Sequence, residues 1–399
     1  MRDILFLKNE IQPYPWGSKT AIPQLLGRPN PDDLPQAELW MGAHPKAPSV
    51  VQTPEGGVPL DELIERCPDD ILGPRVSTVF EHKLPFLFKV LAAAEPLSIQ
   101  AHPDASMARD GFARETRSGL PLNAPERNYR DPNPKPECVC ALTPFWALHG
   151  FRPPAQILDH LRMLCPRELK TEIGAFAERC NTEGLRRLFA ALLALDPLLR
   201  RRTIAAAVSK AEKLNAESLD WIPSLARRYP DDIGALAPAL MNTLRLDPGQ
   251  ALYLTAGVLH AYLGGTAIEL MANSDNVVRG GLTSKHIDIP ELFKVVSFDA
   301  HEVRLVRTEA RIQTETTYVT PAVEFALSAI HLSPGDRHVS GADRNVEILL
   351  CIDGKADLLE MGPGGKTLEI PRGKSVLVPA AARAYCLTGS ARLYKATVP

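Results

Sequence analysis

One stretch of the chain, residues 259–285 with the sequence LHAYLGGTAIELMANSDNVVRGGLTSK, decides how the rest is interpreted. It carries an imidazole, two carboxylates, a guanidinium and an ammonium group in a segment that is otherwise glycine-rich and apolar. These residues are His260, Glu269, Asp275, Arg279 and Lys285. Ionisable side chains are rarely buried in such a segment unless they face a cleft or a partner. The stretch is therefore predicted to form one wall of an active site.

The residues around His260 recur near the C-terminus, which indicates an internal repeat. Residues 249–256 read GQALYLTA and precede the HAY of residues 260–262; residues 373–380 read GKSVLVPA and precede the RAY of residues 383–385. This pattern resembles the second motif of a cupin β-barrel, so two related barrels are predicted. Arg383 stands at the ligand position of the second copy. Because a guanidinium does not bind a cation, the C-terminal barrel is expected to be structural and to lack a metal.

A segment with helical periodicity lies between the two β-rich parts. Ala, Leu, Arg and Glu dominate it, and proline recurs at the expected helix ends. The predicted fold class is mainly β with an α-helical insertion, made of two cupin-type jelly rolls and a helical domain. The expected boundaries are 1–153 and 246–312 for the catalytic jelly roll, 154–245 for the helical insertion, and 313–399 for the C-terminal jelly roll.

Composition argues against several classes of function. A formal net charge of −2 over 399 residues creates no overall field for nucleic acid or a membrane surface. Apolar runs stay below the roughly 20 residues that cross a bilayer, and the N-terminal segment lacks the apolar core of a signal peptide. Seven cysteines without framework spacing fit a reducing compartment. We expect a cytoplasmic protein that binds neither nucleic acid nor membrane.

Four residues of metal-ligand type stand in the predicted β-segments: Gln100, His102, Glu137 and His260. Two imidazoles, a carboxylate and an amide oxygen suit a divalent first-row metal such as zinc. Gln100 and His102 are two residues apart, so on a strand both side chains point to one face. The alternative is that the two histidines are ordinary polar residues at strand ends.

Further charged residues accompany these ligand candidates. They are Lys89, Lys135, Glu269, Asp275, Arg279 and Lys285. Cations beside carboxylates suit a small, anionic, polyhydroxylated ligand, such as a phosphorylated sugar. Each cation alone could be a surface charge, and Lys89 could be an edge residue that reaches water. Walker, Rossmann and Gly-x-Ser-x-Gly patterns do not occur in the sequence, which argues against nucleotide chemistry and serine hydrolysis.

Four segments resemble the type I mannose-6-phosphate isomerases. Residues 129–137 (YRDPNPKPE) are similar to one family signature, and residues 260–285 to another that runs from His-Ala-Tyr to Thr-x-Lys. Residues 97–103 (LSIQAHP) and 12–17 (QPYPWG) also match. The resemblance covers most of the chain. It implies a zinc-dependent aldose–ketose isomerase that interconverts D-mannose 6-phosphate and D-fructose 6-phosphate, in GDP-mannose supply or in mannose catabolism.

The resemblance also implies a role for each matched residue. It implies one zinc ion per chain, with Gln100, His102, Glu137 and His260 as ligands. It implies that nine further residues belong to the pocket. Among them, we expect Arg279, Lys135, Asp275 and Glu269 to be catalytic, and Trp16, Lys89, Ser98, Tyr262 and Lys285 to bind the substrate. Asp275 and Glu269 are both candidates for the base that moves a proton between C2 and C1. We expect a monomer whose partner is a small phosphosugar.

Three positions depart from the family pattern. Pro134 stands where the family usually has His, so a mechanism that assigns proton transfer to that histidine cannot operate here. Gly280 and Ser284 replace the usual Ala and Pro, and the glycine adds backbone freedom. Two alternatives therefore stay open: a non-catalytic phosphosugar-binding protein with two cupin barrels, and an isomerase or epimerase of another phosphosugar.

Overall fold

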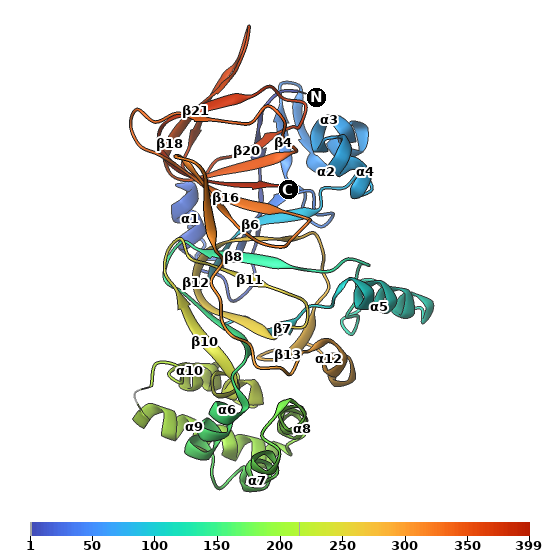
Figure 1. Ribbon diagram of the computed structural model, residues 1–399, viewed down its shortest axis with the longest axis vertical. Helices are drawn as coiled ribbons and strands as arrows, with labels where there is room; N and C mark the ends of the chain where they lie inside the picture. Colours follow the sequence, from blue (N-terminus) through green and yellow to red (C-terminus); the bar gives the residue numbers. More distant parts are fainter. Residues whose placement is uncertain (1, 215) are drawn as a thin grey trace.

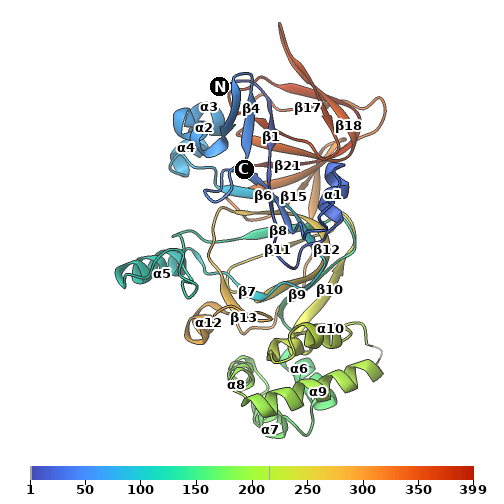
Figure 2. The same cartoon turned by 180° about the vertical axis from the view of Figure 1, so that it is seen from behind.

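The computed structural model describes residues 2–214 and 216–399. Three parts follow one another along its long axis: a helical part at one end, a sheet in the middle and a second sheet at the other end (Figure 1). Seen from behind, helices α5 (Ala105–Arg117) and α12 (Ile289–Val295) project from one side of the middle sheet (Figure 2). The predicted fold class, mainly β with a helical insertion and two sheets, is confirmed.

The middle sheet is built around β12 (His260–Ala272), which forms the first half of the stretch 259–285. This long strand pairs antiparallel with four others: β6 (Phe86–Ala93), β7 (Ile99–Ala101), β8 (Glu137–Ala141) and β9 (Phe145–Phe151). The remaining strands of the sheet are β2 (Glu10–Gln12), β3 (Glu38–Gly42), β10 (Met241–Leu246), β11 (Ala251–Leu254) and β13 (Val278–Gly281). Because β12 contacts so many strands, polar residues at their ends converge on it.

The second sheet contains the C-terminal half of the repeat. Its strands are β14 (Thr308–Ile312), β15 (Glu315–Tyr318), β16 (Ala326–Leu332), β17 (His338–Val339), β18 (Glu347–Glu360), β19 (Thr367–Pro371), β20 (Ser375–Val378) and β21 (Tyr385–Thr397). In both copies of the repeat a short strand, β11 or β20, precedes a long one, β12 or β21. Arg383 lies just before β21, is exposed, and donates a hydrogen bond to the Pro363 carbonyl.

The N-terminal segment corrects the predicted domain boundaries. Strands β1 (Leu5–Lys8), β4 (Val50–Thr53) and β5 (Gly56–Pro59) belong to the second sheet, although the range 1–153 had assigned them to the catalytic jelly roll. The reason is pairing between distant segments: β1 aligns with β20, with Leu5 opposite Leu377. Strand β14 also joins the second sheet, ahead of the expected boundary at 313. Four short helices follow or separate these strands: α1 (Ala21–Leu26), α2 (Leu60–Arg66), α3 (Pro68–Leu72) and α4 (Pro74–Val79).

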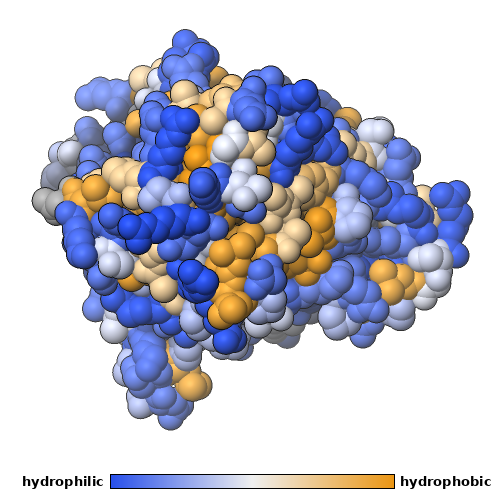
Figure 3. Space-filling view, turned by 90° about the horizontal axis from the view of Figure 1, so that it is seen from below, coloured by the Kyte–Doolittle hydropathy of each residue, from blue (hydrophilic) through white to orange (hydrophobic). Residues whose placement is uncertain are grey.

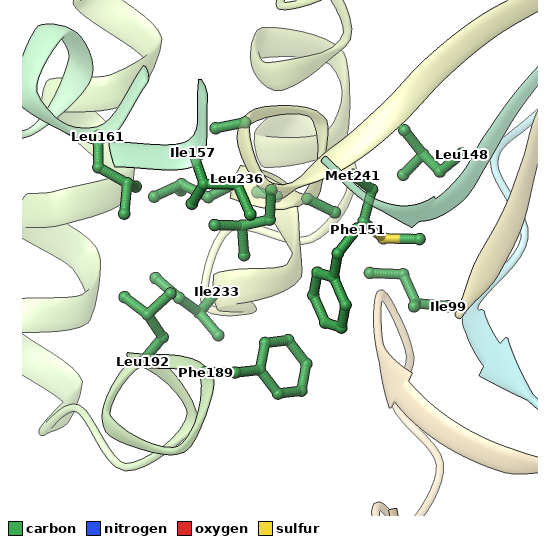
Figure 4. Close-up of a cluster of buried hydrophobic side chains, with 14 of the residues drawn as sticks. Ile99, Leu148, Phe151, Ile157, Leu161, Phe189, Leu192, Ile233, Leu236 and Met241 are labelled. Carbon is green, nitrogen blue, oxygen red and sulfur yellow. The ribbon is translucent and has the colours of Figure 1, made fainter. Parts of the chain in front are cut away.

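The helical part packs directly on the middle sheet. It contains α6 (Pro154–Leu164), α7 (Lys170–Glu178), α8 (Thr182–Leu193), α9 (Pro197–Leu214), α10 (Trp221–Arg228), the 3₁₀ helix η1 (Ile233–Leu236) and α11 (Ala237–Leu240). Figure 4 shows the shared core, in which Ile99, Leu148 and Phe151 of the sheet meet Phe189 and Ile233 of the helical part. Burial of this apolar surface fixes the helical part against the strand that carries Gln100.

The helical segment ends earlier than predicted. Residues 241–245 were assigned to the helical insertion, but they form most of β10, which pairs with β9. Their composition is compatible with a helix or a strand. They form a strand because they pair with the edge of β9 that β12 does not occupy. This is a tertiary effect that a local pattern cannot report.

The face at the helical end has apolar residues near its centre, bordered by hydrophilic ones (Figure 3). Exposed apolar side chains of the helical part include Leu198 and Met163. Within residues 2–214 and 216–399, every helix is too short or too polar to span a bilayer.

Candidate active site

Three side chains of metal-ligand type meet at one end of the middle sheet. His102 follows β7, Glu137 begins β8 and His260 begins β12. The pairing of β12 with β7 sets Gln100 directly opposite His260. One ligand atom from each of the three residues lies within 4.8 Å of the others. The strands therefore bring together positions that are up to 158 residues apart in the sequence.

Backbone carbonyls fix the orientation of both imidazole rings. His102 Nδ1 donates to the Asn276 carbonyl oxygen at 2.8 Å, and His260 Nδ1 donates to that of Val258 at 3.0 Å. Because the proton of each neutral ring is used at Nδ1, the lone pair is at Nε2, which faces Glu137. The Nε2 to carboxylate distances are 3.1 Å for His102 and 3.6 Å for His260. Such second hydrogen bonds are typical of histidines that bind metals.

Electrostatics favour the metal-binding protonation states of these residues. Burial, together with the neighbouring His102, lowers the pKa of His260 to about 3, and burial lowers the pKa of His102 as well. Burial would raise the pKa of Glu137, but Lys135 and His102 outweigh this effect and hold it well below its usual range. Two neutral imidazoles and an ionised carboxylate are the forms that coordinate a cation.

One buried atom supports the fit to a metal. His102 Nε2 is buried and makes no hydrogen bond, despite its short distance to Glu137. A buried nitrogen lone pair without a donor is costly unless a ligand satisfies it. The donor set of two imidazole nitrogens and a carboxylate, with an amide oxygen nearby, suits zinc. The residues present therefore fit the metal that the sequence predicted.

A cavity of about 70 Å³ opens beside these ligands. Most of the predicted site residues line it, and one polar lining residue, Glu38, was not predicted. The polar lining residues are Glu38, Lys89, Ser98, Gln100, Lys135, Glu137, His260, Tyr262 and Glu269. The Gln100 amide nitrogen donates to Ser98 Oγ at 3.0 Å, which leaves the amide oxygen as the atom that could coordinate a metal. Tyr262 donates its hydroxyl proton to Glu137 at 3.2 Å.

Lys89 is buried in this cavity rather than being an edge residue that reaches water. Its Nζ donates to Glu269 at 3.1 Å and lies 3.4 Å from Glu38. Burial alone would lower the pKa of Lys89, but Glu38 and Glu269 outweigh it and raise the pKa. Burial raises the pKa of Glu269, with Lys89 opposing the shift. Sequence reasoning missed Glu38; its signal was a carboxylate two residues before Trp40 on a strand that is buried throughout.

Three other predicted residues, Asp275, Arg279 and Lys285, do not line the cavity. Arg279 lies directly opposite Gln100, which does line it. Asp275 is held at its two oxygens, by Lys46 Nζ at 2.6 Å and by His44 Nε2 at 3.5 Å. Burial opposes ionisation of Asp275, but these two contacts outweigh it and lower its pKa. Sequence reasoning did not identify His44 or Lys46, because neither belongs to a motif that it used.

Arg279 and Lys285 belong to a group of cations that we call the cationic rim, consisting of Lys46, Arg130, Arg279 and Lys285. Burial lowers the pKa of Arg279, and Arg130 adds to the effect. Burial also lowers the pKa of Lys285, and the other three cations add to it. Lys46 of this group is at the same time paired with Asp275 at 2.6 Å.

Neither Trp16 nor Pro134 lines the cavity. Trp16 stacks on Tyr14 with ring centroids 5.7 Å apart and packs against the cluster that contains Tyr262. Pro134 lies in a loop clamped by the buried Asn276, whose side chain donates to the carbonyls of Asp131 and Asn133 at 2.8 and 2.9 Å. The proline therefore does not disorder the loop that leads to Lys135 and Glu137.

A jelly-roll sheet whose strand ends gather two imidazoles and a carboxylate around one point defines a metal-dependent cupin protein. Comparisons with known proteins identify the family more closely. Residues 4–154 match the model for the catalytic domain of type I phosphomannose isomerase. The chain is 41% identical to the mannose-6-phosphate isomerase of Escherichia coli (strain K12), over 97% of each chain. It is 37% identical to the human mannose-6-phosphate isomerase, over 73% of this chain and 72% of the human one.

Solved structures agree with the sequence comparison. A crystal structure of zinc-bound mannose 6-phosphate isomerase matches with a TM-score of 0.92 and 39% identity, over 99% of both chains. A mutant of phosphomannose isomerase from Salmonella typhimurium matches with a TM-score of 0.93 at the same identity and coverage. The chain belongs to the type I phosphomannose isomerase family.

Proposed function

We propose that the chain is a zinc-dependent isomerase that interconverts D-mannose 6-phosphate and D-fructose 6-phosphate. The observation that carries the proposal is the convergence of His102, Glu137 and His260 beside a cavity lined by charged and polar side chains. Membership of the family gives the reaction, because the relatives over nearly the full length are mannose-6-phosphate isomerases. A related structure contains zinc, which supports zinc as the metal of this chain.

The proposed zinc ligands are the three clustered residues and the amide oxygen of Gln100. When bound, zinc supplies a positive charge that polarises the oxygen atoms on C1 and C2 of the sugar. The remaining chemistry belongs to side chains of the cavity. Lys135 lies 3.2 Å from Glu137 and is proposed as the donor to the developing oxyanion. Ser98 and Tyr262 are proposed to bind sugar hydroxyl groups.

Glu269 is the stronger of the two candidates for the base. It lines the cavity, is buried, and has a raised pKa. A base with a raised pKa is suited to taking a proton from carbon near neutral pH. Asp275 lies outside the cavity, and its two oxygens already contact Lys46 and His44. We therefore propose that Glu269 moves the proton between C2 and C1 and that Asp275 positions Lys46 of the cationic rim.

The cationic rim is proposed to hold the phosphate group. Arg279 and Lys285 were predicted as site residues, and Arg130 and Lys46 join them electrostatically. An arginine offers a two-pronged contact to phosphate, and lysine adds a point charge. A sugar phosphate bound at the rim would extend its other end towards the cavity. Lys89 is proposed to contact the sugar rather than the phosphate, because two carboxylates neutralise it.

We further propose a cytoplasmic monomer whose partner is the phosphosugar alone. The cysteine pattern and the nearly balanced charge support this assignment. The proposed domain division keeps a catalytic jelly roll, a helical insertion and a C-terminal jelly roll without metal, with the strand exchanges described above.

A coupled assay for fructose 6-phosphate formation tests the proposal. Purified protein with added zinc is expected to turn over mannose 6-phosphate faster than any other aldose phosphate in a panel. Preference for another sugar phosphate would instead favour an isomerase or epimerase of that sugar. The non-catalytic alternative rests on Pro134; it would be favoured by tight binding of mannose 6-phosphate in calorimetry without any turnover.

A further inference from the structure

The surroundings of Lys89 are set by the register of three strands. Lys89 lies on β6, directly opposite Trp40 of β3 on one side and Glu269 of β12 on the other. Glu38 precedes Trp40 by two residues on β3, so both side chains point to the same face of the sheet as Lys89. Each of the four residues is buried. The backbone pairing of the three strands is therefore sufficient to place these four side chains next to one another.

The side chains then make a closed set of contacts. Lys89 Nζ lies 3.4 Å from Glu38 Oε2, and the Trp40 indole N–H donates to the same oxygen at 2.5 Å. The ammonium group also lies 5.4 Å from the centre of a Trp40 ring, a cation–π distance. Trp40 thus braces the Glu38 carboxylate through its N–H and contacts the Lys89 ammonium through its ring.

The ammonium group of Lys89 has three N–H donors, and two of them face carboxylates in the structure. One donor is used by Glu269 at 3.1 Å, and a second faces Glu38. Lys89 lines the cavity, so its remaining donor is available to a ligand there. If Glu38 did not share the ammonium group, Glu269 would attract it alone. The ammonium would then move from its position between the two carboxylates towards Glu269 and neutralise the proposed base more completely.

We propose that Glu38, braced by Trp40, is a positioning residue that holds Lys89 between two carboxylates so that one ammonium donor faces the substrate. The inference rests on the proposed function, because its effect is expressed through the isomerisation. Glu38 acts through Lys89 and does not itself need to contact the sugar. A small displacement of a group that contacts the reacting atoms can cost about 100-fold in rate.

The C-terminal sheet offers a matched control for a purely structural role. Lys395 there lies 2.6 Å from Glu315 and 3.5 Å from Glu347, and all three residues are buried. This is also a buried lysine between two carboxylates, but it belongs to the other sheet and lines none of the active-site cavity. Loss of one carboxylate should have a similar effect on folding at either place.

The experiment compares Glu38→Gln, Trp40→Phe and Glu315→Gln with the wild type, all with zinc. Steady-state kinetics with mannose 6-phosphate, zinc content and thermal unfolding are measured for each. Glu38→Gln is expected to lower kcat by about 10- to 100-fold while KM changes less than about threefold. Trp40→Phe keeps an aromatic ring but loses the N–H, so kcat should fall in the same direction by a smaller factor. Glu315→Gln should lower the unfolding temperature and leave kcat unchanged.

Each outcome decides the inference. Unchanged kcat in a folded, zinc-loaded Glu38→Gln protein would overturn it, as would a loss of kcat in Glu315→Gln of the same size. If Glu38→Gln does not fold, Trp40→Phe decides in its place, and an unchanged kcat there overturns the inference. If the wild type is active and Glu38→Gln has the same kcat, only this inference is contradicted and the proposed function stands. An inactive wild type contradicts the proposed function and removes the inference with it.

Discussion

The Nε2 lone pairs of two buried imidazoles are free because each ring carries its proton on Nδ1 and donates it in a hydrogen bond to a backbone carbonyl. His102 and His260 were predicted as ligands from residue type, strand spacing and family resemblance, and the structure brings them to Glu137. Glu38 was not predicted, because a carboxylate in an apolar strand shows no function until its neighbours on other strands are known. His44 was missed for the same reason, since its contact with Asp275 joins residues 231 positions apart.

The two candidate bases should respond differently to removal of their charge. Glu269→Gln is expected to lower kcat by about 100-fold or more, because it removes the buried acceptor in the cavity. Asp275→Asn should lower kcat less and act mainly on KM, through Lys46, the residue of the cationic rim that Asp275 contacts. Steady-state kinetics of the two zinc-loaded variants make the comparison. A larger loss of kcat in Asp275→Asn than in Glu269→Gln would reverse the assignment.

Arg279 should act in binding. Arg279→Ala is expected to raise KM for mannose 6-phosphate by about 10- to 100-fold, the loss that follows from one charge-assisted contact to phosphate, with a smaller effect on kcat. Arg201→Ala provides the control. Arg201 is an exposed residue of α9 in the helical part, is paired with Asp231, and does not line the active-site cavity. An unchanged KM with a strongly reduced kcat would instead assign Arg279 to stabilisation of the transition state.

At the scale of elements, β13 joins the helical part to the active site and carries a substitution relative to the family. A methyl group added at Gly280 would meet Ile99 and Leu259 at 3.4 to 3.7 Å, which is ordinary contact. It would also project towards a small apolar cavity of about 20 Å³ between the sheet and the helical part. The alanine usual in the family therefore fits here, and the glycine leaves this strand less restrained.

Gly280→Ala is expected to stabilise the protein by about 0.5 kcal/mol, because alanine restricts the unfolded chain and fills part of the cavity. Gly281→Ala is the control, since Gly281 has φ +150°, a backbone conformation that a side chain strains. It should destabilise the protein by about 1 kcal/mol or more. Thermal unfolding of both variants measures the difference. Equal effects of the two substitutions would contradict this account of β13.

Which elements could be predicted depended on the range of the interactions that form them. The helical insertion follows from local periodicity and composition, and it was predicted. The stretch 259–285 was predicted only as one wall of an active site; its first half forms the long strand β12, which His260 begins. The strand at 241–246 and the transfer of β1 to the second sheet depend on partners at least 90 residues away in the sequence. Local patterns carry no information on such partners, so these boundaries could not be derived from the sequence alone.

At the scale of the whole molecule, a buried histidine in the second sheet should make stability depend on pH. Burial lowers the pKa of His338 from 6.5 to about 4, with Glu315 opposing and Lys395 adding to the shift. Between these two values the unfolded chain binds more protons than the folded one. The stabilising contribution is therefore complete above pH 6.5 and is lost as the pH falls towards 4.

His338→Gln should weaken this acid sensitivity by on the order of 1 kcal/mol between pH 7 and pH 5. The measurement is thermal or urea unfolding of metal-free wild type and variant at both pH values, so that release of a metal does not contribute. Activity at pH 7 should be retained, because His338 does not line the active-site cavity. An identical change in stability for both proteins would exclude His338 as a cause.

The fold brings together Gln100, His102, Glu137 and His260, which lie on or directly after β7, β8 and β12. We propose that these four residues hold a metal on which turnover depends. Elemental analysis combined with the isomerase assay tests this most directly, on wild type and Glu137→Gln before and after treatment with a chelator. The account predicts about one zinc per wild-type chain, loss of activity on chelation, recovery with added zinc, and neither zinc nor activity in the variant. Full activity in a verified metal-free wild type would contradict it.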